Sequence, residues 1–284
     1  MKSFKFFFIY FFAAPTLIIY VSCNRSPGYP TPDTYDLNHP VTVKLESQLD
    51  EISGIIYYPK DTSVFAISDA NGSLYKIFPD RNAAVQKWKF GNNEDFEDLQ
   101  LVDSTFYILS SKGNIVSVRF TAPDSMQTTN FKFPEKKDEF ESLYYDSALR
   151  KLILICKDCH DDKKSSVSSW SFDIDSQTFG KGPVTLDADK IADLLHLKEI
   201  NFKPSAAAIN PATHELYILS SVNKALLITD TNGTTKKVYP LSPAIYKQPE
   251  GIAFTPKGDL LISNESSDEG SANIQVIKYK KATK

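Results

Sequence analysis

The sequence predicts an all-β protein built from five copies of one short unit. The 14 Tyr and 19 Phe residues, together with Val, Ile and Thr, recur in short runs bounded by Asp, Asn, Gly and Pro. This composition is typical of short strands joined by turns. One motif appears five times, at intervals that mostly lie close to 44 residues. Four short strands and their turns fill an interval of that length.

Each copy of the motif starts with a pair of polar or acidic residues two positions apart, and then runs through two apolar segments separated by a turn. The second members of the pairs are Ser53, Glu97, Glu141, Ser205 and Glu250, which lie 44, 44, 64 and 45 residues apart. A period near 44 without helices is typical of a β-propeller, in which each repeat forms one blade. Five copies predict five blades. A six-bladed ring is the main alternative, because the long interval could hide another blade.

The elements follow from the repeats in chain order. Turns are expected at Asn71-Gly72, Lys112-Gly113, Asn232-Gly233 and Lys257-Gly258. The 64-residue interval contains an insertion at residues 186–201, where Ile191, Leu194, Leu195 and Leu197 follow Asp187 as a possible helix cap. The last repeat is too short for four strands, so Val41–Leu45 is expected to complete it. A strand from the beginning of the chain in the last blade would close the ring and remove its open sheet edges.

The first residues carry the pattern of an export signal. Lys2 and Lys5 precede an apolar run at residues 6–21, which Pro15 interrupts, and a polar, Pro-rich stretch follows at residues 24–40. A run of 16 apolar residues is short for a helix that spans a bilayer. The segment is therefore expected to be cleaved after export rather than retained in the membrane.

The end of this segment, Tyr20-Val21-Ser22-Cys23, resembles a bacterial lipobox, although Tyr20 departs from the usual Leu. The resemblance implies that Cys23 is lipidated and becomes the first residue. We therefore expect a signal peptide at residues 1–22, a lipidated Cys23 with a polar tether at residues 23–40, and one propeller domain at residues 41–284. The alternatives are an ordinary signal peptide and an uncleaved anchor.

The repeated acids are the candidate binding site. Residues two apart on a strand share a face, so the pairs at the starts of the inner strands should project towards the channel. Carboxylates gathered in a small volume repel one another unless a cation or raised pKa values compensate. Oxygen-only ligands suit calcium better than zinc. The alternative is that these acids cap strand starts and bond neighbouring blades. The candidate metal ligands are Glu51, Asp95, Glu97, Glu139, Glu141, Glu250 and Glu265, with Asp69 at the same mouth and Lys203 as the only cation at the pair positions.

The segment Cys156-Lys-Asp-Cys159-His160 is a second candidate site. It satisfies the C-x-x-C-H pattern of c-type haem attachment. An oxidising compartment favours a disulfide between Cys156 and Cys159, and that pairing leaves no odd thiol once Cys23 is lipidated. We prefer the disulfide or a free structural pair over haem, and rank metal binding by these cysteines last.

Charge and motifs exclude several classes of function. The chain has 32 Lys and Arg against 35 Asp and Glu, so its net charge of −3 offers no basic surface for nucleic acid. It has no G-x-S-x-G, H-E-x-x-H or Walker-type motif. No catalytic residue can be assigned from the sequence.

Several motifs resemble the SdiA-regulated family of bacterial propeller proteins. They are Glu51-Ile-Ser-Gly-Ile, Lys203-Pro-Ser-Ala-Ala and Gln248-Pro-Glu-Gly-Ile-Ala-Phe, followed by Gly258-Asp-Leu-Leu-Ile-Ser-Asn-Glu265. The resemblance implies a five-bladed, exported and often lipid-anchored propeller related to proteins with NHL repeats. It implies no established activity. We expect a membrane-anchored monomer, on the periplasmic or outer face, that binds an unknown ligand or protein partner. A calcium-dependent hydrolase of the lactonase, esterase or phytase kind is the alternative.

Overall fold

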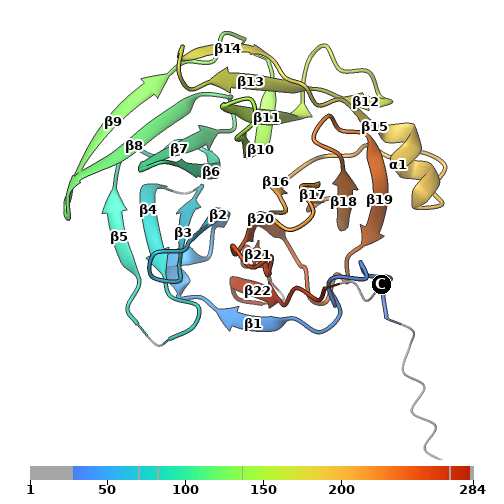
Figure 1. Cartoon of the computed structure of the whole chain (residues 1–284), viewed down its shortest axis with the longest axis horizontal. Helices are drawn as coiled ribbons and strands as arrows, with labels where there is room; N and C mark the ends of the chain where they lie inside the picture. Colours follow the sequence, from blue (N-terminus) through green and yellow to red (C-terminus); the bar gives the residue numbers. More distant parts are fainter. Residues whose placement is uncertain (1–27, 70, 82, 136, 269, 282–284) are drawn as a thin grey trace, which may run out of the picture.

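The computed structural model describes residues 28–281 apart from 70, 82, 136 and 269. The predicted signal peptide and Cys23 lie outside the described residues. Five four-stranded antiparallel sheets stand around a central channel as the blades of a β-propeller (Figure 1). The five-bladed prediction is confirmed. The six-bladed alternative is wrong because the long interval adds no sheet to the ring.

The strands of each blade follow one another from the channel outwards. Blade 1 contains β2 (Ile52–Tyr58), β3 (Ser63–Ser68), β4 (Asn71–Ile77) and β5 (Gln86–Lys89). Blade 2 contains β6 (Phe96–Val102), β7 (Thr105–Ser110), β8 (Ile115–Ala122) and β9 (Ser125–Phe131). Blade 3 contains β10 (Glu139–Asp146), β11 (Lys151–Asp158), β13 (Ser169–Asp173) and β14 (Thr178–Lys181). Blade 4 contains β16 (Ala206–Ile209), β17 (Leu216–Ser220), β18 (Ala225–Thr229) and β19 (Thr235–Pro240).

Blade 5 is completed by a strand from the beginning of the chain. It contains β20 (Pro249–Phe254), β21 (Leu260–Asn264), β22 (Asn273–Ile277) and, outermost, β1 (Val41–Lys44). The strand β1 pairs antiparallel with β22, with Val41 opposite Val276 and Lys44 opposite Asn273. The predicted closing strand is therefore present. A short 3-10 helix (Ser47–Leu49) then leads from β1 into blade 1.

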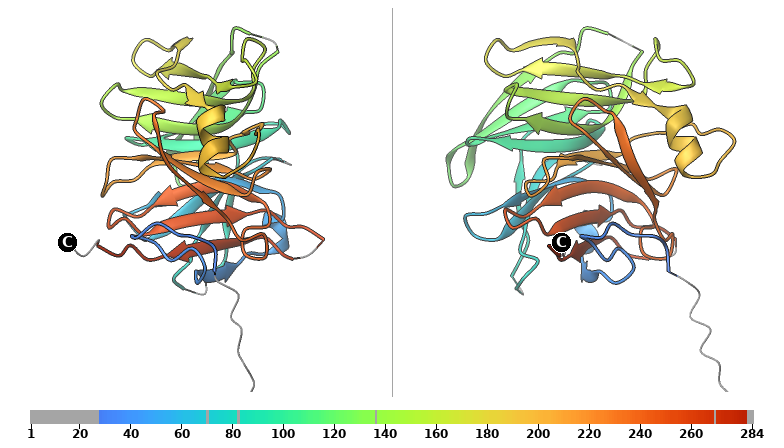
Figure 2. Two further views of the ribbon diagram at one scale, coloured as in Figure 1. Left: turned by 90° about the vertical axis from the view of Figure 1, so that its right-hand side faces the viewer. Right: turned by 45° about the vertical axis from the view of Figure 1, so that its right-hand side comes forward.

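The insertion between blades 3 and 4 forms the helix that the sequence predicts. Helix α1 (Ala188–Leu194) starts at Asp187, whose side chain accepts a hydrogen bond from the Lys190 backbone N–H and so caps the helix. Before it, β12 (Ser166–Val167) and β15 (Leu186–Asp187) form a two-stranded sheet. The helix packs on the outside of the ring, against β19 (Figure 2). Among the described residues, no helix is long and apolar enough to cross a membrane.

The predicted tether is partly wrong, because the segment before β1 packs on the propeller. Tyr35 and Leu37 are 1% and 2% exposed. The Tyr35 hydroxyl donates to the Gly258 carbonyl and accepts from the Asn210 amide, and the Tyr246 hydroxyl donates to the Leu37 carbonyl. These bonds join the segment to blades 4 and 5. The folded domain therefore begins before Val41.

The core lies between neighbouring blades. One cluster packs Phe65 of blade 1 against Phe106 of blade 2, with their ring centroids 4.7 Å apart, and comparable clusters fill the other interfaces. Glycines at positive φ make three of the predicted turns: Gly113, Gly233 and Gly258. The fourth prediction is misplaced, because Asn71 and Gly72 are the first residues of β4.

Candidate functional site

The five inner strands β2, β6, β10, β16 and β20 surround the channel and contact one another in a ring (Figure 1). They run in the same direction along it, because the ends of all five line one cavity. Their starts therefore meet at one end of the channel. We call this end the acid mouth and define it by the predicted ligands Glu51, Asp95, Glu97, Glu139, Glu141, Glu250 and Glu265.

Three glutamates of the acid mouth sit at interruptions of the strand ladder. The register shifts between Phe96 and Asp98 in β6, with Glu97 between them. It shifts in the same way around Glu141 in β10 and around Glu250 in β20. A β-bulge leaves one residue without a partner and turns its side chain out of the regular alternation. Three different blades therefore each contribute one glutamate that is released from strand pairing.

These bulges revise the sequence argument, which assumed that both members of a pair share a face. Asp95 and Glu139 are exposed, whereas Glu97 and Glu141 are half-buried. Regular alternation fails because the bulge adds a residue to the inner strand. The second members of the pairs thus form the inner part of the acid mouth, and the first members form its rim.

The inner glutamates hold their protons unusually tightly. Burial, and then the charges of Glu141 and Asp95, raise the pKa of Glu97 to about 9. Burial, and then the charge of Glu141, raise the pKa of Glu250 to about 8. Burial also raises the pKa of Glu141, although Lys157 opposes the shift. The charge of Glu141 thus raises the pKa of both Glu97 and Glu250, so the three glutamates lie close enough to influence one another's protonation.

A second pair of acids lies where blades 1 and 5 meet. The Gln248 side-chain amide donates to Glu265 at 2.8 Å. Burial, and then contact with Glu51, raise the pKa of Glu265 to about 7 despite this hydrogen bond. Glu265 therefore exchanges a proton close to neutral pH.

The acid mouth also contains lysines that the sequence argument did not assign to it. Lys157, at the end of β11, forms an ion pair with Glu141. Burial alone would lower the pKa of Lys157, but the hydrogen bond and charge of Glu141 raise it. Lys224 lies near Glu250, and burial lowers its pKa. Lys203, which the sequence analysis did name, has its Nζ 3.4 Å from Asp158 Oδ2. Lys157 follows the apolar run of its second strand as Asp69 follows the corresponding run in blade 1. Comparison of this position between repeats would therefore have identified Lys157.

The bonds between blades, which the sequence left as an alternative role for the acids, are made mostly by other residues. Buried Asp98 accepts hydrogen bonds from the Leu99 and Leu143 backbone N–H groups and so joins blades 2 and 3. Ser205 donates to the Pro249 carbonyl, and Ser263 donates to the Ser53 carbonyl. Glu97 and Glu141 make none of the backbone bonds named above, whereas the Glu250 side chain forms a hydrogen bond with Ser221 of blade 4 and so does join two blades.

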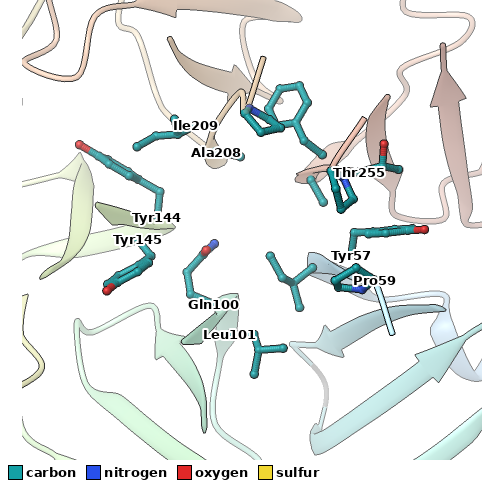
Figure 3. A pocket seen from close by; sticks show the side chains of 14 residues that line it. Tyr57, Pro59, Gln100, Leu101, Tyr144, Tyr145, Ala208, Ile209 and Thr255 are labelled. Carbon is teal, nitrogen blue, oxygen red and sulfur yellow. The ribbon is translucent and has the colours of Figure 1, made fainter. Parts of the chain in front are cut away.

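The opposite end of the channel is apolar. A cavity of about 280 Å³ lies where the inner strands end, and all five blades line it. Its lining includes Tyr57, Leu101, Tyr145, Ile209 and Pro256. Figure 3 shows the Gln100 amide reaching into this space, while the hydroxyl groups of Tyr57 and Tyr145 point away from it.

The cysteine motif lies at the end of β11. Cys156 and Cys159 form a disulfide with their Cα atoms 5.6 Å apart. Both are buried, at 0% and 6% exposure. Bonded sulfur atoms have no thiol left for thioether attachment, so this arrangement does not fit haem.

The chain also matches a known protein family. The sequence profile of the SdiA-regulated family covers residues 34–268. The chain belongs to the SdiA-regulated family. The match starts one residue before buried Tyr35, which agrees with a domain that begins ahead of β1.

Solved structures similar to this SdiA-regulated propeller share its fold at low sequence identity. Glutaminyl cyclase from Myxococcus xanthus is 14% identical with a TM-score of 0.59, over 85% of this chain and 97% of that one. The PQQ-bound aldose sugar dehydrogenase from Streptomyces coelicolor is 9% identical with a TM-score of 0.53, over 89% and 100%. A luciferin-regenerating enzyme is 12% identical with a TM-score of 0.51, over 86% and 96%. No curated protein matches the sequence. A shared propeller fold does not transfer an activity.

Proposed function

We propose that this SdiA-regulated propeller is a binding protein whose acid mouth takes a divalent cation, with calcium as the best match. One observation carries the proposal. Glu97, Glu141 and Glu250 come from three blades, each sits at a bulge, and each has a raised pKa. Perturbed acids that converge at a channel mouth are a common mark of a functional site.

A bound cation would offset the cost of gathering these groups. Carboxylates in a half-buried space repel one another when ionised, and Lys157 is the only described lysine that forms an ion pair with one of the three. Calcium accepts carboxylate oxygens from flexible positions and completes its shell with water. It would bind the ionised carboxylates and so displace their protons.

The spacing of the acids limits how the ion would be held. Within the described part of the chain, only Cys156, Cys159 and Asp162 form a set of three potential ligands whose atoms all lie within 4.8 Å of one another. The acid mouth therefore offers fewer than three carboxylates at direct-ligand spacing. Water molecules would supply the remaining ligands, as calcium and magnesium both tolerate.

Thermal unfolding in the presence of calcium tests the proposal. Calcium should raise the melting temperature of the wild type in a saturable way, because a ligand that binds only the folded state stabilises it. The variant with Glu97→Gln and Glu141→Gln should lose this response. The matched control carries Glu94→Gln and Glu135→Gln, at exposed positions, and should keep it. A wild type that does not respond to calcium or magnesium would refute the cation site.

We also propose that the protein is exported and held at a membrane through a lipid on Cys23. The support is the basic, apolar and small-residue pattern of residues 1–23. Diacylation makes membrane attachment stable, whereas a single chain gives reversible binding. The Cys23→Ser variant should therefore move from the membrane fraction to the soluble fraction. Retention of the variant in membranes would contradict lipidation at Cys23.

A calcium-assisted hydrolase is the second candidate, and one observation favours it. Glu265 has a pKa of about 7, which is suited to general acid–base catalysis at neutral pH. Hydrolysis of simple lactones, aryl esters or phosphate monoesters, assayed with calcium, should then depend on Glu265 and be abolished by Glu265→Gln. Equal rates for the variant and the wild type would exclude this role for Glu265.

A further inference from the structure

The turn after β11 brings together three potential metal ligands that the acid mouth does not use. Cys156, Cys159 and Asp162 each offer one ligand atom, and these atoms lie within 4.8 Å of one another. Both cysteines are buried, and Asp162 is half-buried. The two sulfur atoms are joined in a disulfide, so they are not available as thiolates in this state.

Backbone contacts hold Asp162 beside the cysteines. Its N–H donates to the Cys159 carbonyl at 3.0 Å, and its Oδ2 accepts from the Ser168 N–H at 3.0 Å. The Ser168 hydroxyl lies 3.5 Å from Cys156 Sγ. A carboxylate fixed by a backbone donor, with a hydroxyl next to one sulfur, has the outer contacts that orient metal ligands.

An entry path leads to two of these three residues. A cavity of about 610 Å³ is lined by Cys159, Asp162, Ser165 and Phe202, among others. It lies between the turn after β11 and the segment that follows α1. A metal ion could therefore reach Cys159 and Asp162 from this cavity, with fully buried Cys156 directly behind Cys159.

We propose that reduction of the Cys156–Cys159 disulfide converts this turn into a zinc site with Cys156, Cys159 and Asp162 as ligands. A dithiol reductant donates two electrons and two protons, becomes a disulfide itself, and leaves two cysteine thiols. Zinc then displaces both thiol protons and binds the two thiolates and the carboxylate. Water from the cavity fills the fourth position.

The chemistry of these ligands selects zinc. Two cysteines separated by two residues are a common half of a tetrahedral zinc site. Thiolates favour zinc over calcium, whereas the all-carboxylate acid mouth favours calcium. Ligand atoms around a tetrahedral zinc stand about 3.3–3.8 Å apart, given metal–ligand distances near 2.0–2.3 Å. Small side-chain rotations would bring the three groups to that spacing.

Cobalt substitution tests the site directly in the full chain. The protein is reduced with a phosphine under anaerobic conditions, desalted and titrated with cobalt(II) and then with zinc(II). Reduced wild type should bind one equivalent of cobalt with a thiolate-to-cobalt charge-transfer band, and zinc should remove that band. Oxidised wild type should show no band. Absence of the band in the reduced protein, including through unfolding on reduction, would overturn the proposal.

Variants test the ligand set. Cys159→Ser should abolish the charge-transfer band, and Asp162→Asn should weaken zinc binding at least about tenfold, as loss of a ligand would. Asp161→Asn is the matched control, because Asp161 is the exposed neighbour and should leave binding unchanged. Melting curves of the oxidised variants show whether each is folded. Equal affinities for a folded Asp162→Asn variant and the wild type would overturn the role of Asp162.

Discussion

The two ends of the channel are built from the same five inner strands, yet they differ in chemistry and in regularity. At the acid mouth, three strands carry a bulge and a glutamate with a raised pKa. At the opposite end the paired register is regular, and Tyr, Leu, Ile and Pro line a cavity of about 280 Å³. In each repeat, therefore, the end of the inner strand contributes apolar side chains to the cavity lining. The start of the inner strand contributes acidic side chains in three of the five blades.

Loss of the closing strand β1 should destabilise the whole ring, and with it both ends of the channel. Deletion of residues 41–44 would leave β22 as an open edge and remove Val43 from the cluster between blades 5 and 1. We expect loss of more than about 3 kcal/mol, a large part of the 5–15 kcal/mol typical of a folded domain. Chemical denaturation measures it, with a chain that starts at Gly28 and retains the strand as the control. Equal unfolding midpoints would show that β1 does not hold the ring closed.

A change of pH should change the contribution of the acid mouth to stability. The folded protein holds the proton of Glu97, with its pKa of about 9, more tightly than the unfolded chain, whose glutamates titrate near 4.5. The unfolded chain binds fewer protons between these values, so the contribution of this group to stability falls as pH rises from about 4.5 to about 9.

Glu97→Gln should remove that dependence. At pH 8 the variant should be more stable than the wild type by about 1–3 kcal/mol, since one pKa unit corresponds to about 1.4 kcal/mol and solvent screens part of the effect. Denaturant titrations at pH 5 and pH 8 measure the difference, with exposed Glu94→Gln as the control. Parallel pH profiles for wild type and Glu97→Gln would contradict the raised pKa.

The smallest effect is expected at the apolar end. Tyr144 is 1% exposed, and its buried hydroxyl has no hydrogen-bond partner among the residues that the structure describes. Burying an unpaired hydroxyl costs free energy, so Tyr144→Phe should leave the protein unchanged or stabilise it by up to about 1 kcal/mol. Tyr145→Phe, in the same cavity lining, serves as the control. A marked loss of stability with Tyr144→Phe alone would mean that the hydroxyl has a partner.

The fold was predictable because the repeats determine strand order. The recurring motif located every inner strand, with three of its four spacings near 44 residues, and the short last repeat indicated that β1 would close blade 5. The apolar periodicity and Asp187 also located helix α1. Packing of Tyr35 and Leu37 was missed, because a Pro-rich stretch with scattered apolar residues reads as a tether and its partners lie more than 170 residues away.

The gathering of the acids at one end of the channel, the acid mouth, was predictable, but their geometry was not. Repeat alignment identified Glu97, Glu141 and Glu250, since the same position recurs in each unit. The alternation of side chains along a strand gives no sign of a bulge at these positions. The sequence therefore did not predict that the acids divide into an exposed rim and a half-buried inner group. The ion pair of Glu141 with Lys157 depends on a neighbouring strand of the same blade, which the first part of the repeat does not describe.

Closure of the ring by β1 has a consequence for how the protein folds. Val41 pairs with Val276, 235 residues later in the chain. By the logarithmic dependence on loop length, joining two positions so far apart costs about 5 kcal/mol of chain entropy if the rest is unfolded. Blades made of neighbouring strands can form first and shorten this loop. A nascent chain that still lacks β22 therefore leaves β1 unpaired and exposes β21 as an open edge of blade 5. Its vulnerability to aggregation ends only when the first and last strands of the ring meet.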